Sequence, residues 1–122
     1  MSKKNQIRRK FREDVFDRDG YCCKWCGNGP VLEFPESVFD SHHIFDRNST
    51  EFKGTGGYVK ENGITLCKYD ENGLEENSCH MKAEKFHISE GKEWESGMHP
   101  DDLYKMIGSS RELAIEKSNN LK

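Results

Sequence analysis

Four cysteines are spaced along the chain in a way that suits one tetrahedral metal ion. Cys23 and Cys26 are separated by two residues and followed by Gly27, so a single tight turn can direct both thiolates at the same ion. The second pair, Cys67 and Cys79, is separated by 11 residues, a wider gap than the about two to four residues of a common zinc motif. We expect a structural zinc ion bound by four thiolates, those of Cys23, Cys26, Cys67 and Cys79.

The fifth cysteine, Cys22, is left over, because Cys23 provides the gap of two residues that a metal-binding turn needs. Three other interpretations of the cysteines stay open: buried free thiols, replacement of one thiolate by His87, and a redox pair formed by Cys23 and Cys26. The redox interpretation is disfavoured, since no alternation of strands and helices surrounds the two cysteines.

Two adjacent histidines, His42 and His43, lie between the cysteine pairs in a segment predicted to be a strand. Successive side chains of a strand point to opposite faces, so we expect the two imidazoles to have different roles. Near neutral pH an imidazole can accept a proton from an attacking water or bind a metal ion, which are the two requirements of phosphodiester hydrolysis. Taken singly, each histidine is more often structural than catalytic.

The elements that must position these residues are short. Ile7, Phe11 and Val15 recur every four residues and predict an amphipathic helix that ends near Asp19. Loops are expected at 48–63, which is rich in glycine, and at 70–77. The remaining predicted elements are strands at 31–34, 38–44 and 64–66, a helix at 79–88, and two further helices that begin at Pro100 and near Ser110.

Composition and charge narrow the class of protein. With 122 residues, of which 33% are hydrophobic and 34% charged, the chain has room for one domain with a small apolar core that a bound metal would help to stabilise. The net charge is −3, yet residues 1–12 include six basic side chains and no acidic one, a basic arm that could contact phosphates. A solvated terminus is the alternative. No apolar membrane span or signal segment is evident, so we expect a cytoplasmic protein without membrane contact.

Taken together, these motifs resemble the HNH endonuclease family in its four-cysteine, zinc-containing form. The matching segments, in order, are 17–27 (DRDGYCCKWCG), His42-His43-Ile44, Gly56-Gly57, 61–67 (ENGITLC) and Cys79-His80. The resemblance implies an α+β fold: a small ββα-metal unit, the His-Me finger, held by a structural zinc and flanked by N- and C-terminal helices. One domain, 1–122, then contains a basic arm (1–10), an HNH core (11–88) and a helical extension (89–122).

The resemblance also implies roles for individual residues. His43 matches the general base, whereas His42 and His80 match the ligands of a catalytic divalent cation. Asn62 matches the central asparagine, which ties the connecting loop and orients the base. His87, seven residues after His80, could assist as a further metal ligand on the same helix face.

Two details of this site stay open at the level of the sequence. Arg47 could grip a phosphate bidentately, although a surface ion pair is the commoner fate of such a residue. The sparse protein shell suits Mg²⁺ as the catalytic ion, while two imidazoles also suit Mn²⁺, Ni²⁺ or Zn²⁺.

We expect activity to fall below about pH 6.5, where an unperturbed imidazole becomes protonated.

The implied function is metal-dependent hydrolysis of phosphodiester bonds in DNA, by nicking or double-strand cleavage, in a bacterial or phage-infected cell. Its partners are DNA and, in one possible setting, a targeting or packaging protein, with the chain as a monomer or a homodimer. The alternative is a non-catalytic zinc-containing module that binds nucleic acid or protein. That alternative explains the cysteines and the basic arm, but not the order of His42-His43, Asn62 and His80.

Overall fold

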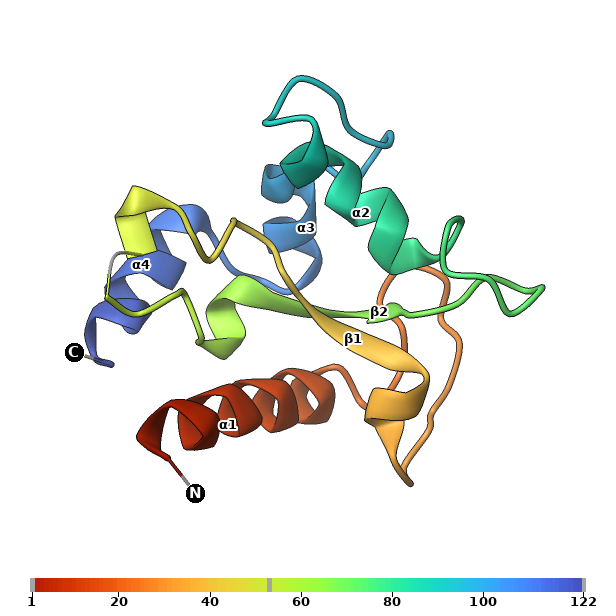
Figure 1. Ribbon diagram of the computed structural model, residues 1–122, viewed down its shortest axis with the longest axis horizontal. Helices are drawn as coiled ribbons and strands as arrows, with labels where there is room; N and C mark the ends of the chain where they lie inside the picture. The colour runs from red at the N-terminus through yellow and green to blue at the C-terminus, as the bar shows by residue number, and fades with distance from the viewer. Residues whose placement is uncertain (1, 53, 122) are drawn as a thin grey trace.

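The chain adopts a mixed α+β fold, which confirms the predicted fold class at this level (Figure 1). The computed structural model describes residues 2–52 and 54–121, and within them four α-helices and one antiparallel sheet of two strands. No helix in this described part is long and apolar enough to cross a membrane. In chain order, the elements are α1 (Lys3–Arg18), β1 (Phe39–His43), β2 (Gly63–Cys67), α2 (Cys79–Ile88), α3 (Pro100–Met106) and α4 (Arg111–Asn119).

Helix α1 contains most of the basic N-terminal residues. Ser2 caps its first turn, because the Ser2 hydroxyl accepts a hydrogen bond of 3.2 Å from the backbone N–H of Asn5. The helix then continues without a break to Arg18. Residues 3–10 of the predicted basic arm are therefore the first half of this helix.

The apolar side of α1 packs on the sheet, as its periodicity predicts. Phe11 and Val15 are buried, whereas Ile7, the first member of the predicted stripe, is half-buried. The contact with the start of β2 is close: a Cβ at Gly63 would lie only 2.5 Å from the Val15 side chain and 2.7 Å from that of Phe11. Glycine at position 63 is therefore what lets α1 approach the strand.

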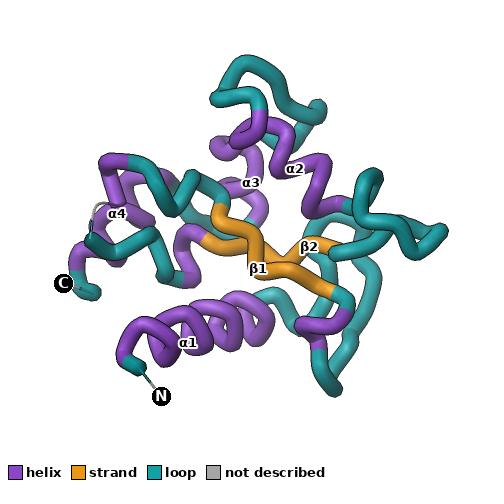
Figure 2. The backbone as a smooth tube through the Cα atoms, in the orientation of Figure 1, coloured by secondary structure: helices purple, strands orange, loops and turns teal. Residues whose placement is uncertain are grey.

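The sheet lies between two helices. β1 and β2 pair antiparallel, with Phe39 opposite Cys67 and His43 opposite Gly63. Helix α1 covers one face of the sheet and α2 covers the other (Figure 1, Figure 2). Every residue of β2 is buried, so this strand is the centre of the small core.

The strand predicted at 31–34 is not present, and this prediction was wrong. These residues form an irregular loop that leads into a short 3₁₀ turn at Pro35–Ser37. Leu32 and Phe34 are exposed, and Phe34 has a left-handed backbone with φ of 50°. In the described structure β1 pairs with β2 only, so residues 31–34 have no partner strand against which to form hydrogen bonds.

The two C-terminal helices begin where the sequence predicts. Pro100 opens α3 with His99 as its N-cap, and the Ser110 hydroxyl caps α4 by accepting from the N–H of Leu113 at 3.1 Å. Leu103 of α3 belongs to the same apolar core as β2. The predicted extension is thus part of the domain core.

Candidate metal centres and active-site cavity

The four cysteines predicted to bind zinc converge in the structure. One sulfur from each of Cys23, Cys26, Cys67 and Cys79 lies within 4.8 Å of the others. The Sγ atoms of Cys26 and Cys67 are 3.5 Å apart. Tetrahedral Zn–S bonds of about 2.3 Å would place sulfurs about 3.8 Å apart, so this group could hold a structural zinc ion.

The first cysteine pair is shaped by a tight turn. The Gly27 N–H donates to the carbonyl of Cys23 at 2.9 Å, and Gly27 takes a left-handed φ of 79°. The Cys26 N–H also points at Sγ of Cys23, 3.5 Å away, which favours the thiolate form. A hydrogen bond of 3.0 Å from the Lys24 N–H to the carbonyl of Thr65 anchors the turn on β2.

The second pair connects the end of β2 to the start of α2. Cys67 is the last residue of β2, and Cys79 is the first residue of α2. Ser78 caps that helix, accepting from the N–H of Met81 at 3.1 Å, and so brings Cys79 to the group despite the long loop between the cysteines. Cys22 lies outside the group, with its Sγ 3.4 Å from the carbonyl of Gly20.

A second group of ligand atoms comes from β1 and α2. Oε1 of Glu84 lies 3.1 Å from Nδ1 of His42 and 3.2 Å from Nε2 of His80. Two donors that bind one ion at about 2.1 Å and at right angles are about 3 Å apart. The two predicted ligands, His42 and His80, are therefore together, and with Glu84 they could hold a metal ion.

His42 supports this assignment by its lack of other partners. The ring is fully buried; its Nδ1 faces Oε1 of Glu84 at 3.1 Å, whereas its Nε2 has no hydrogen-bond partner among the described residues. Burial lowers the pKa of His42 to about 4, so the ring is neutral at physiological pH. A buried ring nitrogen without a hydrogen bond is costly unless an ion or another ligand satisfies it.

Asp40 lies behind His80 on the same face of β1 as His42. Its Oδ2 is 2.8 Å from Nδ1 of His80, which leaves Nε2 of that ring facing Glu84. A carboxylate in this position orients a metal-binding imidazole. Burial acts to lower the pKa of His80, but the contacts with Asp40 and Glu84 outweigh it and raise the pKa to about 9.

His43 lies on the opposite face of β1, as the alternation of strand residues predicts. Its ring stacks on Phe11 of α1 with centroids 4.6 Å apart, and it meets the Tyr58 ring edge-on at 4.7 Å. Nε2 of His43 is buried and has no hydrogen-bond partner among the described residues. Burial lowers the pKa of His43 to about 3, so the ring is uncharged at neutral pH.

Both faces of the end of β1 open on one cavity of about 620 Å³. His42 and His43 line it together with His80 and Glu84, so the predicted base and the predicted cation ligands share one space. The cavity also receives positive charge from several elements. Its basic lining residues, besides the histidines, are Arg8, Arg12, Arg47 and Lys68, and its acidic ones are Glu36, Asp40, Asp46 and Glu84.

Asn62 ties the loop that follows β1. Its amide nitrogen donates to the carbonyls of Phe45 and Gly57, at 3.2 Å each. Its Oδ1 accepts from the Phe45 N–H at 3.1 Å and from the Tyr104 hydroxyl at 2.6 Å. This buried side chain therefore joins residues on both sides of the loop, immediately after the two histidines.

The other two predicted site residues lie at the edge of the site. In the described structure His87 is not a member of the ligand group with Glu84; its Nε2 is 3.0 Å from the backbone carbonyl of His43. Arg47 is exposed and donates from Nη1 to the Tyr58 hydroxyl at 3.1 Å, with its side chain lining the cavity.

The sequence interpretation missed Glu84, Asp40 and Tyr58. Glu84 follows His80 by four residues in the predicted helix, a spacing that places both side chains on one face and could have identified it. Asp40 precedes His42 by two residues and shares its strand face for the same kind of reason. Tyr58 lies in a loop and carries no local signal.

Comparison of the chain with protein-family models, curated proteins and solved structures finds no match. The geometry of the cavity and its two ligand groups is therefore the basis on which a function can be argued.

Proposed function

We propose that the chain is a metal-dependent nuclease of the HNH type that hydrolyses phosphodiester bonds in DNA. The observation that carries the proposal is the meeting of His42, His80 and Glu84 with His43 around one cavity. A module that only binds nucleic acid has no need for a buried imidazole with an unpaired nitrogen beside a carboxylate and a second imidazole. In this proposal β1, β2 and α2 form the ββα unit of the family.

The residues of the cavity divide the chemistry between them. His42, His80 and Glu84 would hold a divalent cation, which would supply neutralisation of the charge on the scissile phosphate and on the departing 3′ oxygen. Neutral His43 accepts a proton from the attacking water. Asp40 keeps Nδ1 of His80 occupied and leaves Nε2 facing Glu84, available as the atom that would bind a metal ion.

Two further residues support this arrangement without touching the ion. Arg47 reaches a non-bridging phosphate oxygen from the cavity edge. Asn62 fixes the loop after β1 and thereby the backbone that carries His43. Two imidazoles and one carboxylate suit Mn²⁺, Ni²⁺ or Zn²⁺, while Mg²⁺ would rely more on water and phosphate oxygens.

The four-cysteine group has a structural role in the proposal. A zinc ion there joins the end of β2 to the first residue of α2, and His80 is the next residue of that helix. The structural ion therefore positions one ligand of the catalytic ion through a single turn of helix.

The test is cleavage of a supercoiled plasmid by the purified protein with Mg²⁺, Mn²⁺ or Ni²⁺, followed by addition of a chelator. We expect cutting that stops with the chelator. His43→Ala should lower the rate by about a hundredfold or more, since a general base contributes at least that factor. Glu84→Gln should weaken metal binding and cutting together.

Glu112→Gln is the matched control, because this exposed carboxylate lies in the first turn of α4. It should cut like the wild type. Unchanged cutting by His43→Ala would remove the role of that residue as the base. No cutting with any of the metals would reject the nuclease and leave the zinc-containing binding module.

A further inference from the structure

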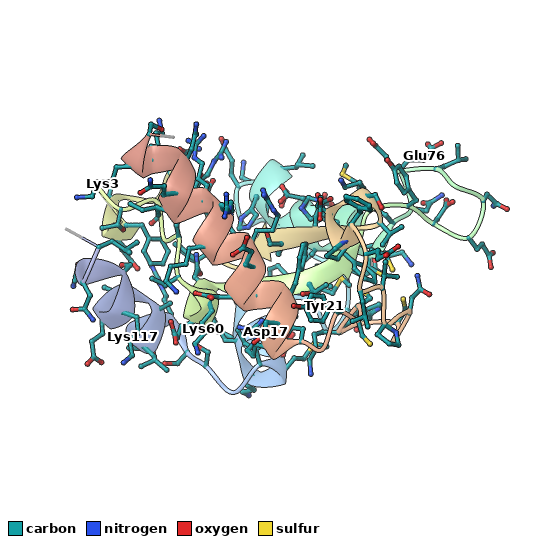
Figure 3. The ribbon with its side chains drawn as sticks, turned by 90° about the horizontal axis from the view of Figure 1, so that it is seen from below. Lys3, Asp17, Tyr21, Lys60, Glu76 and Lys117 are labelled. Atoms are coloured by element: carbon teal, nitrogen blue, oxygen red, sulfur yellow. The ribbon has the colours of Figure 1, made fainter. Side chains whose placement is uncertain are left out.

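A second cavity extends the candidate active site along helix α1. The cavity of about 620 Å³ that contains His80 and a neighbouring cavity of about 600 Å³ that reaches Lys3 and Lys4 meet at residues common to both linings. Figure 3 shows α1 in front of the sheet, with Lys3 at one end and Asp17 near the other. The shared residues are Arg8, Arg47, Asn48 and Tyr58.

Three basic residues of α1 lie at regular intervals along the two adjoining cavities. Lys4, Arg8 and Arg12 are four residues apart, so they lie along one side of the helix. Each step advances about 6 Å along the helix axis. Lys4 and Arg8 line the second cavity, and Arg8 and Arg12 line the first.

The charges on this side of α1 are not compensated, unlike those beside them. Arg9 pairs with Glu13 at 3.2 Å and Lys10 pairs with Asp14 at 2.8 Å. Among the described residues neither Arg8 nor Arg12 has a carboxylate partner, and the Arg8 guanidinium instead lies 5.5 Å from the centre of the Tyr58 ring. The free positive charge of the helix therefore faces the two cavities.

The charge is also unequal in the two cavities. The described lining of the second cavity contains Lys3, Lys4, Arg8 and Arg47 and no carboxylate. The first cavity, by contrast, is lined by four carboxylates, those of Glu36, Asp40, Asp46 and Glu84, and its Lys68 is already held by Asp40 at 3.8 Å and by the carbonyl of Glu36 at 2.6 Å. A polyanion is stabilised toward the N-terminal end of α1 and repelled at the other end.

We propose that this α1 groove, defined by Lys4, Arg8, Arg12 and Arg47, binds the phosphate backbone of one nucleic-acid strand. The strand runs from the candidate active site toward the N-terminal end of α1. Its direction is given by the charges alone, while the position of the scissile phosphate rests on the proposed nuclease function. Binding of this kind is strongly salt-dependent, because each neutralised phosphate releases counterions.

The first test measures binding of a fluorescently labelled oligonucleotide by anisotropy, with the zinc-containing full chain and no other divalent metal. The variant pair Arg8→Gln/Arg12→Gln should weaken binding by at least about tenfold and reduce the slope of log affinity against log salt by about two. The control pair Arg9→Gln/Lys10→Gln removes the same charge from the compensated side of α1 and should stay within about twofold of the wild type. If both variant pairs weaken oligonucleotide binding equally, or if Arg8→Gln/Arg12→Gln does not weaken it, the proposed α1 groove is contradicted.

The second test separates the groove from the nuclease function. Bis(4-nitrophenyl) phosphate is a phosphodiester too short to reach along α1, so in Arg8→Gln/Arg12→Gln its Mn²⁺-dependent hydrolysis should fall by a much smaller factor than plasmid cleavage, which should fall at least about tenfold. If the wild type hydrolyses bis(4-nitrophenyl) phosphate but both variant pairs lose the same amount of oligonucleotide binding, the α1 groove is rejected and the nuclease function is retained. If only Arg8→Gln/Arg12→Gln loses oligonucleotide binding and the wild type hydrolyses neither substrate, the α1 groove is retained and the nuclease function is rejected.

Discussion

Three histidines that line the same cavity have different protonation states because their surroundings differ. Burial lowers the pKa of His42 to about 4 and that of His43 to about 3. For His80 burial acts in the same direction, yet Asp40 and Glu84 raise its pKa to about 9. At neutral pH, His43 is therefore unprotonated, whereas His80 carries a proton that a bound metal ion would displace.

Metal affinity at the group of His42, His80 and Glu84 is expected to rise with pH. Below the pKa of about 9 of His80, one proton leaves when the ion binds, so apparent affinity should increase by up to about tenfold per pH unit. Calorimetric titration with Mn²⁺ at about pH 6, 7 and 8 measures this slope. An affinity that does not change with pH would contradict a proton-releasing ligand.

The same values revise the pH dependence expected from an unperturbed imidazole. A base with a lowered pKa stays neutral to a lower pH, so His43 with a pKa of about 3 is not the group that limits activity near pH 6.5. At saturating metal concentration, the rate should begin to fall only at a pH below about 6.5. At limiting metal concentration, protonation of His80 should release the ion and shift this fall to a higher pH.

At the level of the elements, the C-terminal helices and the turn between them contact the loop that connects β1 to β2. The Tyr104 hydroxyl of α3 donates to Oδ1 of Asn62 at 2.6 Å, and Oγ of Ser109 donates to the carbonyl of Glu61 at 2.8 Å. Arg111 of α4 lies over the Phe45 ring, with its guanidinium carbon 4.2 Å from the ring centre. The extension predicted at 89–122 therefore supports the residues next to β1.

Tyr104→Phe should lower the free energy of unfolding by about 1 kcal/mol. It removes one buried hydrogen bond, while Oδ1 of Asn62 keeps the Phe45 N–H as a donor. Urea denaturation followed by circular dichroism measures the change. Tyr69→Phe is the control, because Tyr69 is exposed and should change stability by less than about 0.5 kcal/mol. Equal effects of the two variants would rule out a contribution from the Tyr104 hydroxyl.

The elements that could be predicted from the sequence are those with local signals. The periodicity of Phe11 and Val15 and the caps at Pro100 and Ser110 act within one or two turns, and all of these predictions are confirmed. The segment 31–34 is rich in strand-forming residues, but a strand also needs a partner, which depends on distant parts of the chain.

In the candidate site, too, the residues with local sequence signals could be predicted and those positioned by long-range contacts could not. Cys23, Cys26 and the paired histidines carry recognisable spacings, and the distance from His80 to Glu84 fits a helix. Tyr58 and Tyr104 reach His43 and Asn62 only through tertiary packing. No spacing in the sequence indicates contacts that form between a loop or a C-terminal helix and a strand far away in the chain.

For the whole molecule, the apolar core is small, and a zinc ion in the four-cysteine group could add to its stability. Only 33% of the residues are hydrophobic, and the loop at 31–34 leaves Leu32 and Phe34 exposed. A structural ion that joins the turn at Cys23 to β2 and α2 connects three separate segments. Folding of such a domain is coupled to metal binding.

Cys26→Ser should lower the melting temperature substantially, because loss of one ligand removes several kcal/mol of metal-binding free energy from the folded state. Cys22→Ser is the matched control, since Cys22 lies next to the group without belonging to it. Thermal melts and zinc content per chain measure the effect. A Cys26→Ser protein that melts no lower than the wild type would argue against a structural zinc ion.

Cys79 and His80 are consecutive residues in the first turn of α2, and each belongs to a different ligand group. An oxidant that converts two of the four thiols to a disulfide would release the zinc, unwind the start of the helix and carry the neighbouring imidazole away from Glu84. In the proposed nuclease, loss of the structural ion would therefore also disturb the ligand group of His42, His80 and Glu84.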